Sequence, residues 1–166
     1  MYDCLAFPSV RLPPTGLNST IRSVMVTEHM LICEETGWWA TAVRRFADDL
    51  PLSLLETGSL SACIDLESNC DVLFLIVEVR RSMLDELIPW TLQVRQRWKQ
   101  TPWVAVTTRE MRRSEWFLRE AGAAHVLFSP RQIGEAICML RRHLYAIRYR
   151  ARSRVEQAFD SFFSDS

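Results

Sequence analysis

Acidic and hydroxyl side chains stand at or beside the carboxyl ends of four apolar stretches that have the length of β-strands. The stretches are residues 30–33, 71–79, 102–107 and 124–128. Parallel neighbours in one sheet would bring these side chains to a single crevice. Carboxylates gathered there would suit Mg²⁺, and without a cation they would repel one another and raise each other's pKa. The candidate site residues are Glu34, Glu35, Glu78, Thr107, Thr108, Ser129 and Pro130.

The stretch 71–79 is the strongest strand candidate, because six apolar residues lie between Asp71 and Glu78. A continuous apolar run of this length predicts a strand that is buried on both faces, as in the middle of a parallel sheet. Residues 52–56 form a further, shorter strand candidate. Residues 21–27 are expected to be an extra edge strand or a lead-in to the first strand.

A helix is expected over residues 37–50, between the first two strands. Trp39, Val43 and Phe46 follow one another at the spacing of one helical face, which predicts that they face the core. Trp38 and Trp39 are adjacent, so they cannot both face inward from one helix. One of them is therefore expected to be exposed.

Capping residues mark two other helices. Ser59 is a suitable N-cap for a helix over residues 60–67. Gly122 is well placed as the residue that ends a helix over residues 109–121. In that second helix the side chains expected to face inward are Trp116, Phe117 and Leu118. The remaining helical patterns are residues 83–100 and residues 132–157.

Strands and helices thus alternate along the chain, which predicts an α/β fold with a parallel sheet and helices on both faces. Five strands favour the flavodoxin-like order 2-1-3-4-5. The length of 166 residues fits one such domain over residues 21–145. Residues 1–20 are expected to be an irregular arm, and residues 146–166 an extension of the final helix that ends in a frayed tail.

The final helix carries an apolar stripe that is longer than one sheet needs. Its members follow at spacings of four and three, and the surplus from Tyr145 onward is rich in arginine. This pattern predicts a surface for a protein partner or a homodimer, although a solvated helix end would show the same charges. The residues assigned to that surface are Ile137, Leu140, Leu144, Ile147, Arg148, Ala151 and Arg152.

Composition limits the function classes. The formal net charge is zero, so overall charge gives no argument for nucleic acid or membrane, and no apolar run approaches the roughly 20 residues of a membrane helix. No secretory pattern stands at the N-terminus. Five cysteines without a CxxC pair suggest reduced thiols in a cytoplasmic protein. The scattered histidines predict no metal site, apart from weak Mg²⁺ binding by Glu34, Glu35 and Glu78.

Over residues 30–144 the chain resembles the receiver domain of bacterial two-component response regulators, whose fold is CheY-like. The resemblance rests on the order of elements, the acid pair Glu34-Glu35, the acid Glu78, a threonine after the fourth strand, and the segment 122–130. That segment is similar to the receiver's Gly-Ala…Leu-x-Lys-Pro sequence and is the most specific match.

The departures from the receiver pattern concern the reactive residues. The resemblance implies an aspartate phosphoacceptor where Glu78 stands, although Val77 could occupy that place instead. The extra methylene of glutamate moves its carboxylate by about 1 Å, enough to impair in-line phosphoryl transfer. Ser129 replaces the lysine that contacts the phosphoryl group, so a charge that would stabilise it is missing.

Three hypotheses about function follow. The preferred one is a pseudo-receiver that is not an enzyme, has no cofactor, and acts in regulation through protein–protein interaction. The first alternative is a phosphorylatable or Mg²⁺-gated receiver that uses Glu78 with Glu34 and Glu35. The second is a regulator whose basic final helix binds nucleic acid, which the overall charge does not favour.

Overall fold

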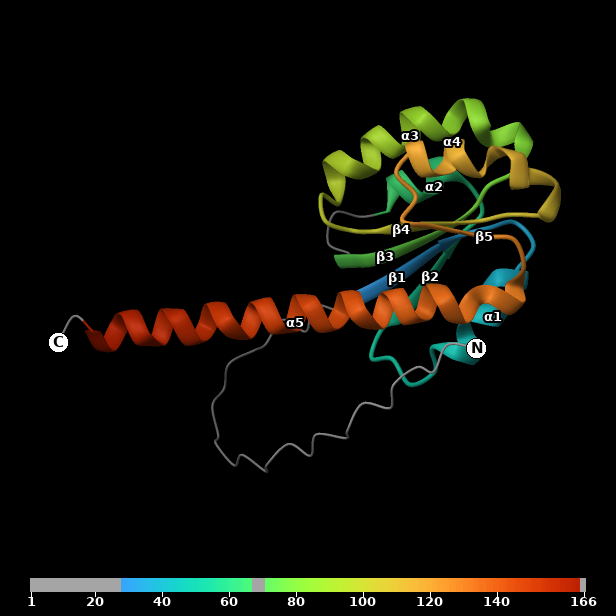
Figure 1. The fold of residues 1–166 in the computed structure, drawn as a ribbon. Helices are drawn as coiled ribbons and strands as arrows, with labels where there is room; N and C mark the ends of the chain where they lie inside the picture. Colours follow the sequence, from blue (N-terminus) through green and yellow to red (C-terminus); the bar gives the residue numbers. More distant parts are fainter. Residues whose placement is uncertain (1–27, 67–70, 165–166) are drawn as a thin grey trace.

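Five parallel strands form one sheet in the order β2-β1-β3-β4-β5, which confirms the predicted fold class and strand order (Figure 1). The computed structural model describes residues 28–66 and 71–164, with side chains described as far as Ala151 and at Ser153. The predicted arm and the strand expected at residues 21–27 lie outside the described residues. The strands are β1 Glu28–Cys33, β2 Ser53–Thr57, β3 Asp71–Glu78, β4 Trp103–Val106 and β5 His125–Leu127.

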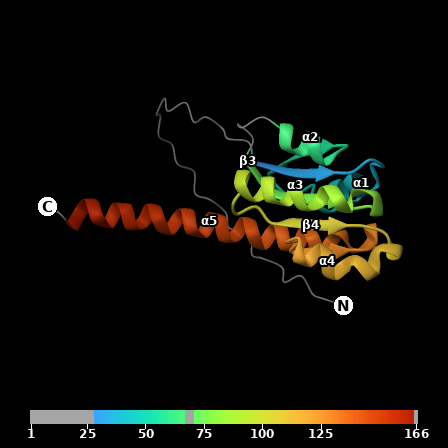
Figure 2. The ribbon, with the colours of Figure 1, turned by 90° about the horizontal axis from the view of Figure 1, so that it is seen from above.

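Helices cover both faces of this sheet. Figures 1 and 2 show α2, α3 and α4 over one face and α1 and α5 over the other. The α-helices are α1 Trp38–Phe46, α2 Leu60–Asp65, α3 Leu84–Arg97, α4 Glu115–Glu120 and α5 Ile133–Ser164. Short 3₁₀ turns precede three of them: η1 Arg81–Met83, η2 Arg109–Ser114 and η3 Pro130–Gln132.

The central strand β3 supplies both halves of the core. Phe74 and Ile76 belong to the apolar cluster under α1 and α5, while Leu75 and Val77 belong to the cluster under α2, α3 and α4. Side chains of a strand alternate between its two faces, and here both faces are covered. The six consecutive apolar residues are therefore explained by burial on both sides.

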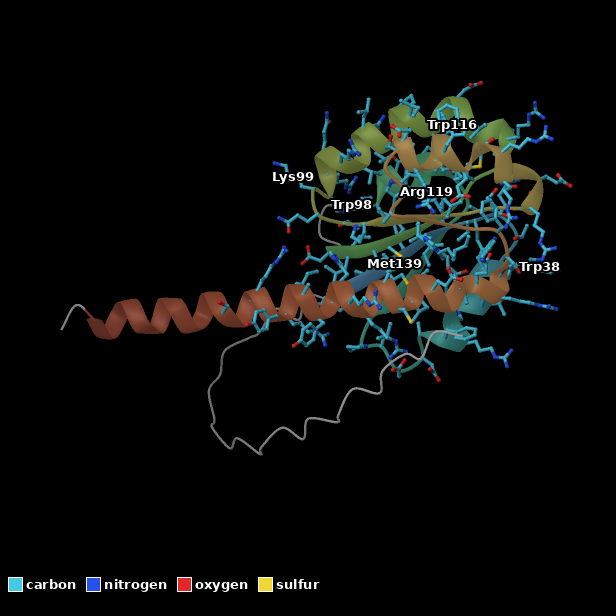
Figure 3. The ribbon with its side chains drawn as sticks, in the orientation of Figure 1. Trp38, Trp98, Lys99, Trp116, Arg119 and Met139 are labelled. Atoms are coloured by element: carbon cyan, nitrogen blue, oxygen red, sulfur yellow. The ribbon has the colours of Figure 1, made fainter. Side chains whose placement is uncertain are left out.

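Two capping predictions are confirmed. The Ser59 hydroxyl accepts a hydrogen bond from the backbone N–H of Ala62, 3.2 Å away, at the start of α2. Gly122 has a φ of 97°, the left-handed conformation that ends a helix and that side chains disfavour. The tryptophan pair also divides as expected, because Trp39 is buried and Trp38 is exposed at the start of α1 (Figure 3).

The inward direction predicted for Trp116 is wrong, since this side chain is 68% exposed on the outer side of α4 (Figure 3). Residues 109–114 form a 3₁₀ turn with three residues per turn, so the α-helical phase begins later than predicted. Leu118 is fully buried, and a residue two positions earlier on a helix points roughly the opposite way. Phe46, also expected to face inward, is 45% exposed at the last turn of α1.

The final helix α5 is 32 residues long, about 48 Å. Leu144 is buried against the sheet, and Arg148 still reaches Glu28 of β1 with an N–O distance of 3.5 Å. Because α5 runs back along parallel strands from their carboxyl ends, its continuation leaves the domain at the opposite end (Figures 1 and 2). No helix among the described residues is both long and apolar enough to cross a membrane.

Candidate functional site

The carboxyl ends of β1, β3 and β4 meet at one edge of the sheet, as the sequence predicted. Cys33 pairs with Val77, and Val77 with Ala105, so the residues that follow these positions emerge side by side. We call this the carboxyl edge; the predicted site residues on it are Glu34, Glu35, Glu78, Thr107, Thr108 and Ser129. Their side chains, however, take three different directions.

Glu34 is turned away from the other acids and caps α1. Its carboxylate accepts hydrogen bonds from the backbone N–H groups of Trp39 at 2.9 Å and Ala40 at 2.5 Å, and from the Thr36 hydroxyl at 3.4 Å. The side chain is only 8% exposed. Gly37, with a φ of 75°, makes the turn that brings the helix start over this carboxylate. Glu34 therefore satisfies N–H groups that the helix itself leaves unpaired, and its charge matches the helix dipole.

Glu35 and Glu78 are adjacent at this edge, and the Arg80 guanidinium interacts with the charges of both. One carboxylate oxygen of Glu78 accepts a hydrogen bond from the backbone N–H of Glu35 at 3.1 Å. The guanidinium of Arg80 makes an ion pair with the carboxylate of Glu35, and the charge of Glu78 also raises the pKa of Arg80. Val77 is fully buried in the core, so Glu78 is the β3 side chain that reaches this edge.

Arg80 was not among the residues predicted from the sequence for the site. It stands two positions after Glu78, just beyond the strand end. In the structure it supplies the positive charge that paired acids need at close range. The signal was present in the sequence as an arginine immediately following an acid-terminated strand.

Arg80 sets the titration of Glu35. Its hydrogen bond and charge hold the pKa of the Glu35 carboxyl below the usual value. A carboxyl with a depressed folded pKa stabilises the fold above its unfolded pKa, and that contribution is lost as pH falls through the folded pKa. We expect Arg80→Ala to return the pKa of Glu35 toward its ordinary value, measured by NMR titration of the side-chain carboxyl. Arg81→Ala, which removes an exposed neighbouring arginine, is the control, and an equal shift there would contradict the assignment.

The hydroxyl residues contact backbone. The Thr107 hydroxyl is buried and donates to the carbonyl of Val79 at 2.6 Å, which ties the end of β4 to the chain leaving β3. Thr108 is exposed at the start of η2. The Ser129 hydroxyl accepts from the backbone N–H of Arg131 at 3.4 Å, and Pro130 opens η3. These contacts position loops. Ser129 is uncharged, so it supplies no positive charge to an anion at this edge.

The arrangement offers little to Mg²⁺. Among the residues that the structure describes, no three His, Cys, Asp or Glu side chains gather as a metal site would require. Glu34 is committed to α1, and the remaining pair, Glu35 and Glu78, already lies beside the Arg80 guanidinium. A divalent cation would have to displace that guanidinium before it could bind.

The predicted partner stripe divides along α5. Ile137, Leu140 and Leu144 lie in the domain's own core, under α1 and the sheet, so they are not open to a partner. Ile147 is half-buried, Arg148 pairs with Glu28, and Ala151 is exposed. The side chain of Arg152 lies outside the described part of the chain. Tyr145 and Tyr149, not assigned from the sequence, are exposed, with rings stacked at 6.3 Å between centroids.

Comparison with known proteins gives structural likeness without sequence likeness. No family model and no curated protein sequence matches the chain. A CheY-like protein, tadZ, from Pseudomonas aeruginosa PAO1 superposes with a TM-score of 0.58 at 13% identity, covering 70% of this chain and 98% of that one. The non-phosphorylated HemR receiver domain from Leptospira biflexa gives 0.52 at 17% identity, covering 70% and 93%.

A third similar structure is the pilus assembly protein CpaE from Caulobacter crescentus CB15, with a TM-score of 0.53 at 18% identity, covering 69% of this chain and 93% of that one. This chain covers nearly the whole length of each of these structures. The chain therefore has the fold of a CheY-like receiver domain.

Proposed function

We propose that the chain is a pseudo-receiver, a regulatory module that acts through protein–protein interaction in the cytoplasm and does not transfer phosphoryl groups. The observation that carries this proposal is the ion pair between Arg80 and Glu35 beside Glu78. Phosphoryl transfer depends on a metal ion that neutralises charge and on a positioned cation near the phosphoryl oxygens. Here Arg80 of the same chain already supplies the positive charge beside Glu35 and Glu78.

The absence of a lysine at position 129 supports the same conclusion. The receiver resemblance places a lysine where Ser129 stands, and the Ser129 hydroxyl is engaged with the backbone of η3. Glu78 is also longer than the aspartate of that pattern, and its carboxylate is held by the amide of Glu35. Three features of the carboxyl edge thus act against a phosphorylated state.

The outer part of α5 is the surface we assign to the partner. Its side chains Tyr145, Tyr149 and Ala151 are exposed, and Ile147 is only half-buried. Aromatic residues and arginines are the types that most often carry the energy of protein interfaces. A protein of different sequence and a second copy of this chain are both compatible with that surface.

Incubation with Mg²⁺ and a small phosphodonor such as acetyl phosphate should leave the chain unmodified, because the acids lack a free metal site. Intact mass spectrometry measures this directly. Arg80→Ala is the informative variant, since removing the guanidinium frees Glu35 and Glu78 for Mg²⁺. We expect tryptophan fluorescence to respond to Mg²⁺ more in Arg80→Ala than in the wild type. A phosphorylated Glu78 in the wild type would support the phosphorylatable receiver instead.

Removing residues 149–166 should reduce the apparent size by more than the lost mass if the outer part of α5 holds two copies together. The shortened chain keeps the Glu28–Arg148 pair and the buried Leu144, so its core stays covered. Light scattering coupled to size-exclusion chromatography measures both forms. Two monomers would remove the homodimer from the proposal and leave a different protein as the partner.

The arginines of α5 also favour a second candidate, binding to nucleic acid. Arg148 and Arg150 are exposed, and Arg152 and Arg154 follow in sequence. Its signature would be binding to duplex DNA that weakens steeply with salt and is lost when Arg148, Arg150 and Arg152 are replaced together by glutamine. Binding that is indifferent to salt would count against it.

A further inference from the structure

Two cysteines lie together at the end of the sheet beneath α2. Cys33 is the last residue of β1, and Cys63 lies in α2. Thr57 joins them: it is the β2 residue paired with Cys33, and its hydroxyl oxygen is 3.0 Å from the sulfur of Cys63. Residues paired across parallel strands point to the same face, so both sulfurs adjoin the Thr57 side chain. Both cysteines are buried in the same apolar cluster.

The two thiols also affect each other's ionisation. A hydrogen bond with Cys63, followed by burial, holds the pKa of the Cys33 thiol well above its usual value. The same hydrogen bond lowers the pKa of the Cys63 thiol. A thiolate is the form that reacts with oxidants, and the lowered pKa favours that form at Cys63.

We propose that Cys33 and Cys63 are a dithiol pair that forms a reversible disulfide under oxidation. This goes beyond the proposed function, since nothing in a partner-binding module requires adjacent thiols. Three observations carry it: the strand pairing of Cys33 with Thr57, the contact of Thr57 with Cys63, and the burial of both sulfurs in one cluster.

With a peroxide as oxidant the chemistry balances in two steps. The Cys63 thiolate attacks a peroxide oxygen, so that a sulfur–oxygen bond forms, the oxygen–oxygen bond breaks, and hydroxide takes a proton from solvent to leave as water. Cys33 then gives up its proton and attacks the Cys63 sulfur, which forms the disulfide and expels a second water. Together the two thiols lose two protons and two electrons, and the peroxide is reduced to two waters.

Access depends on α2. Both sulfurs are closed off from water, so the oxidant reaches them when this helix opens. The helix has six residues and buries Leu60 and Cys63, and short elements with few buried contacts open at low cost. The resulting disulfide would tie α2 to the end of β1, directly before Glu34 and Glu35.

The test uses the full chain with Cys4, Cys70 and Cys138 replaced by serine, which leaves Cys33 and Cys63 as its thiols. After treatment with hydrogen peroxide, we expect a mass loss of about 2 Da and no alkylation of the unfolded chain, both reversed by dithiothreitol. The matched controls add Cys33→Ser or Cys63→Ser, and each should lose the 2 Da species. Two alkylated thiols, or sulfurs that gain oxygen without a cross-link, would overturn the proposal.

Peptide mapping of the wild type keeps the proposal testable if the serine variant does not fold. Trypsin places Cys33 in the peptide 23–44, and Cys63 with Cys70 in the peptide 46–80. A second cut after Glu67 separates Cys63 from Cys70. A cross-link between the fragments that hold Cys33 and Cys63 is the expected result, and a cross-link to Cys70 or Cys138 in its place would contradict it.

Discussion

Replacing Phe74 with alanine is expected to lower the free energy of unfolding by about 3–5 kcal/mol, the usual cost of deleting a buried phenyl ring. Phe74 is fully buried in β3, the middle strand of the sheet, and packs in the cluster under α1 and α5. The neighbouring backbone is fixed by pairing on both sides, so the cavity cannot close easily. Denaturation in urea, followed by tryptophan fluorescence, measures the loss.

Phe46→Ala is the matched control, because it deletes the same side chain at a position that is 45% exposed. Its expected cost is about 1 kcal/mol, since much of the ring already contacts water and little cavity is left behind. Equal losses for the two variants would show that β3 does not lie at the centre of the core.

Replacing Glu34 with alanine is the second large effect, expected to cost about 2–3 kcal/mol. Hydrogen bonds to charged groups contribute more than neutral ones, and Glu34→Ala leaves the N–H groups of Trp39 and Ala40 unpaired at a buried helix start. Glu34→Gln keeps one acceptor oxygen and should recover part of the loss. Thermal or chemical unfolding of the wild type, Glu34→Ala and Glu34→Gln measures the order of their stabilities.

Glu35→Ala is the control that separates capping from acidity. Glu35 is the next residue along, carries the same charge, and is exposed, so its ion pair with Arg80 is expected to contribute little to stability. If Glu34 and Glu35 were equivalent acids of one metal site, the alanine variants of both would instead weaken Mg²⁺ binding and would have the same free energy of unfolding. A larger stability loss for Glu35→Ala would contradict the capping role of Glu34.

Features that depend on local pattern could be predicted from the sequence. Residue type and immediate neighbours were enough to predict three of them: the apolar run in β3, the N-cap Ser59 and the left-handed Gly122. The alternation of strands and helices predicted the parallel sheet, and the count of five strands favoured the order that the structure shows. The same reasoning placed the site residues at one edge, because parallel strands end together.

The directions of the acidic side chains at the site, and of Trp116, could not be predicted, because they depend on contacts between elements. Glu34 and Glu35 are identical in type and adjacent, yet one caps α1 and the other pairs with Arg80. The difference arises from the turn at Gly37, which aims the helix start at Glu34. Trp116 was placed on the wrong side because a 3₁₀ turn changes the number of residues per turn, and no residue type marks where that turn ends.

Because α5 is one continuous helix, it transmits rotations of its N-terminal part to its C-terminal end. The helix begins just after η3, beside the carboxyl edge, and from Leu144 to its end at Ser164 it runs about 30 Å. A rotation of about 10° around Leu144 would carry the far end through about 5 Å, because no loop interrupts the helix to absorb it. Small changes in how α5 packs on α1 and the sheet therefore produce larger displacements at its C-terminal end. Conversely, a partner bound to the C-terminal end of α5 can shift the carboxyl edge, where Glu35 and Arg80 form their ion pair.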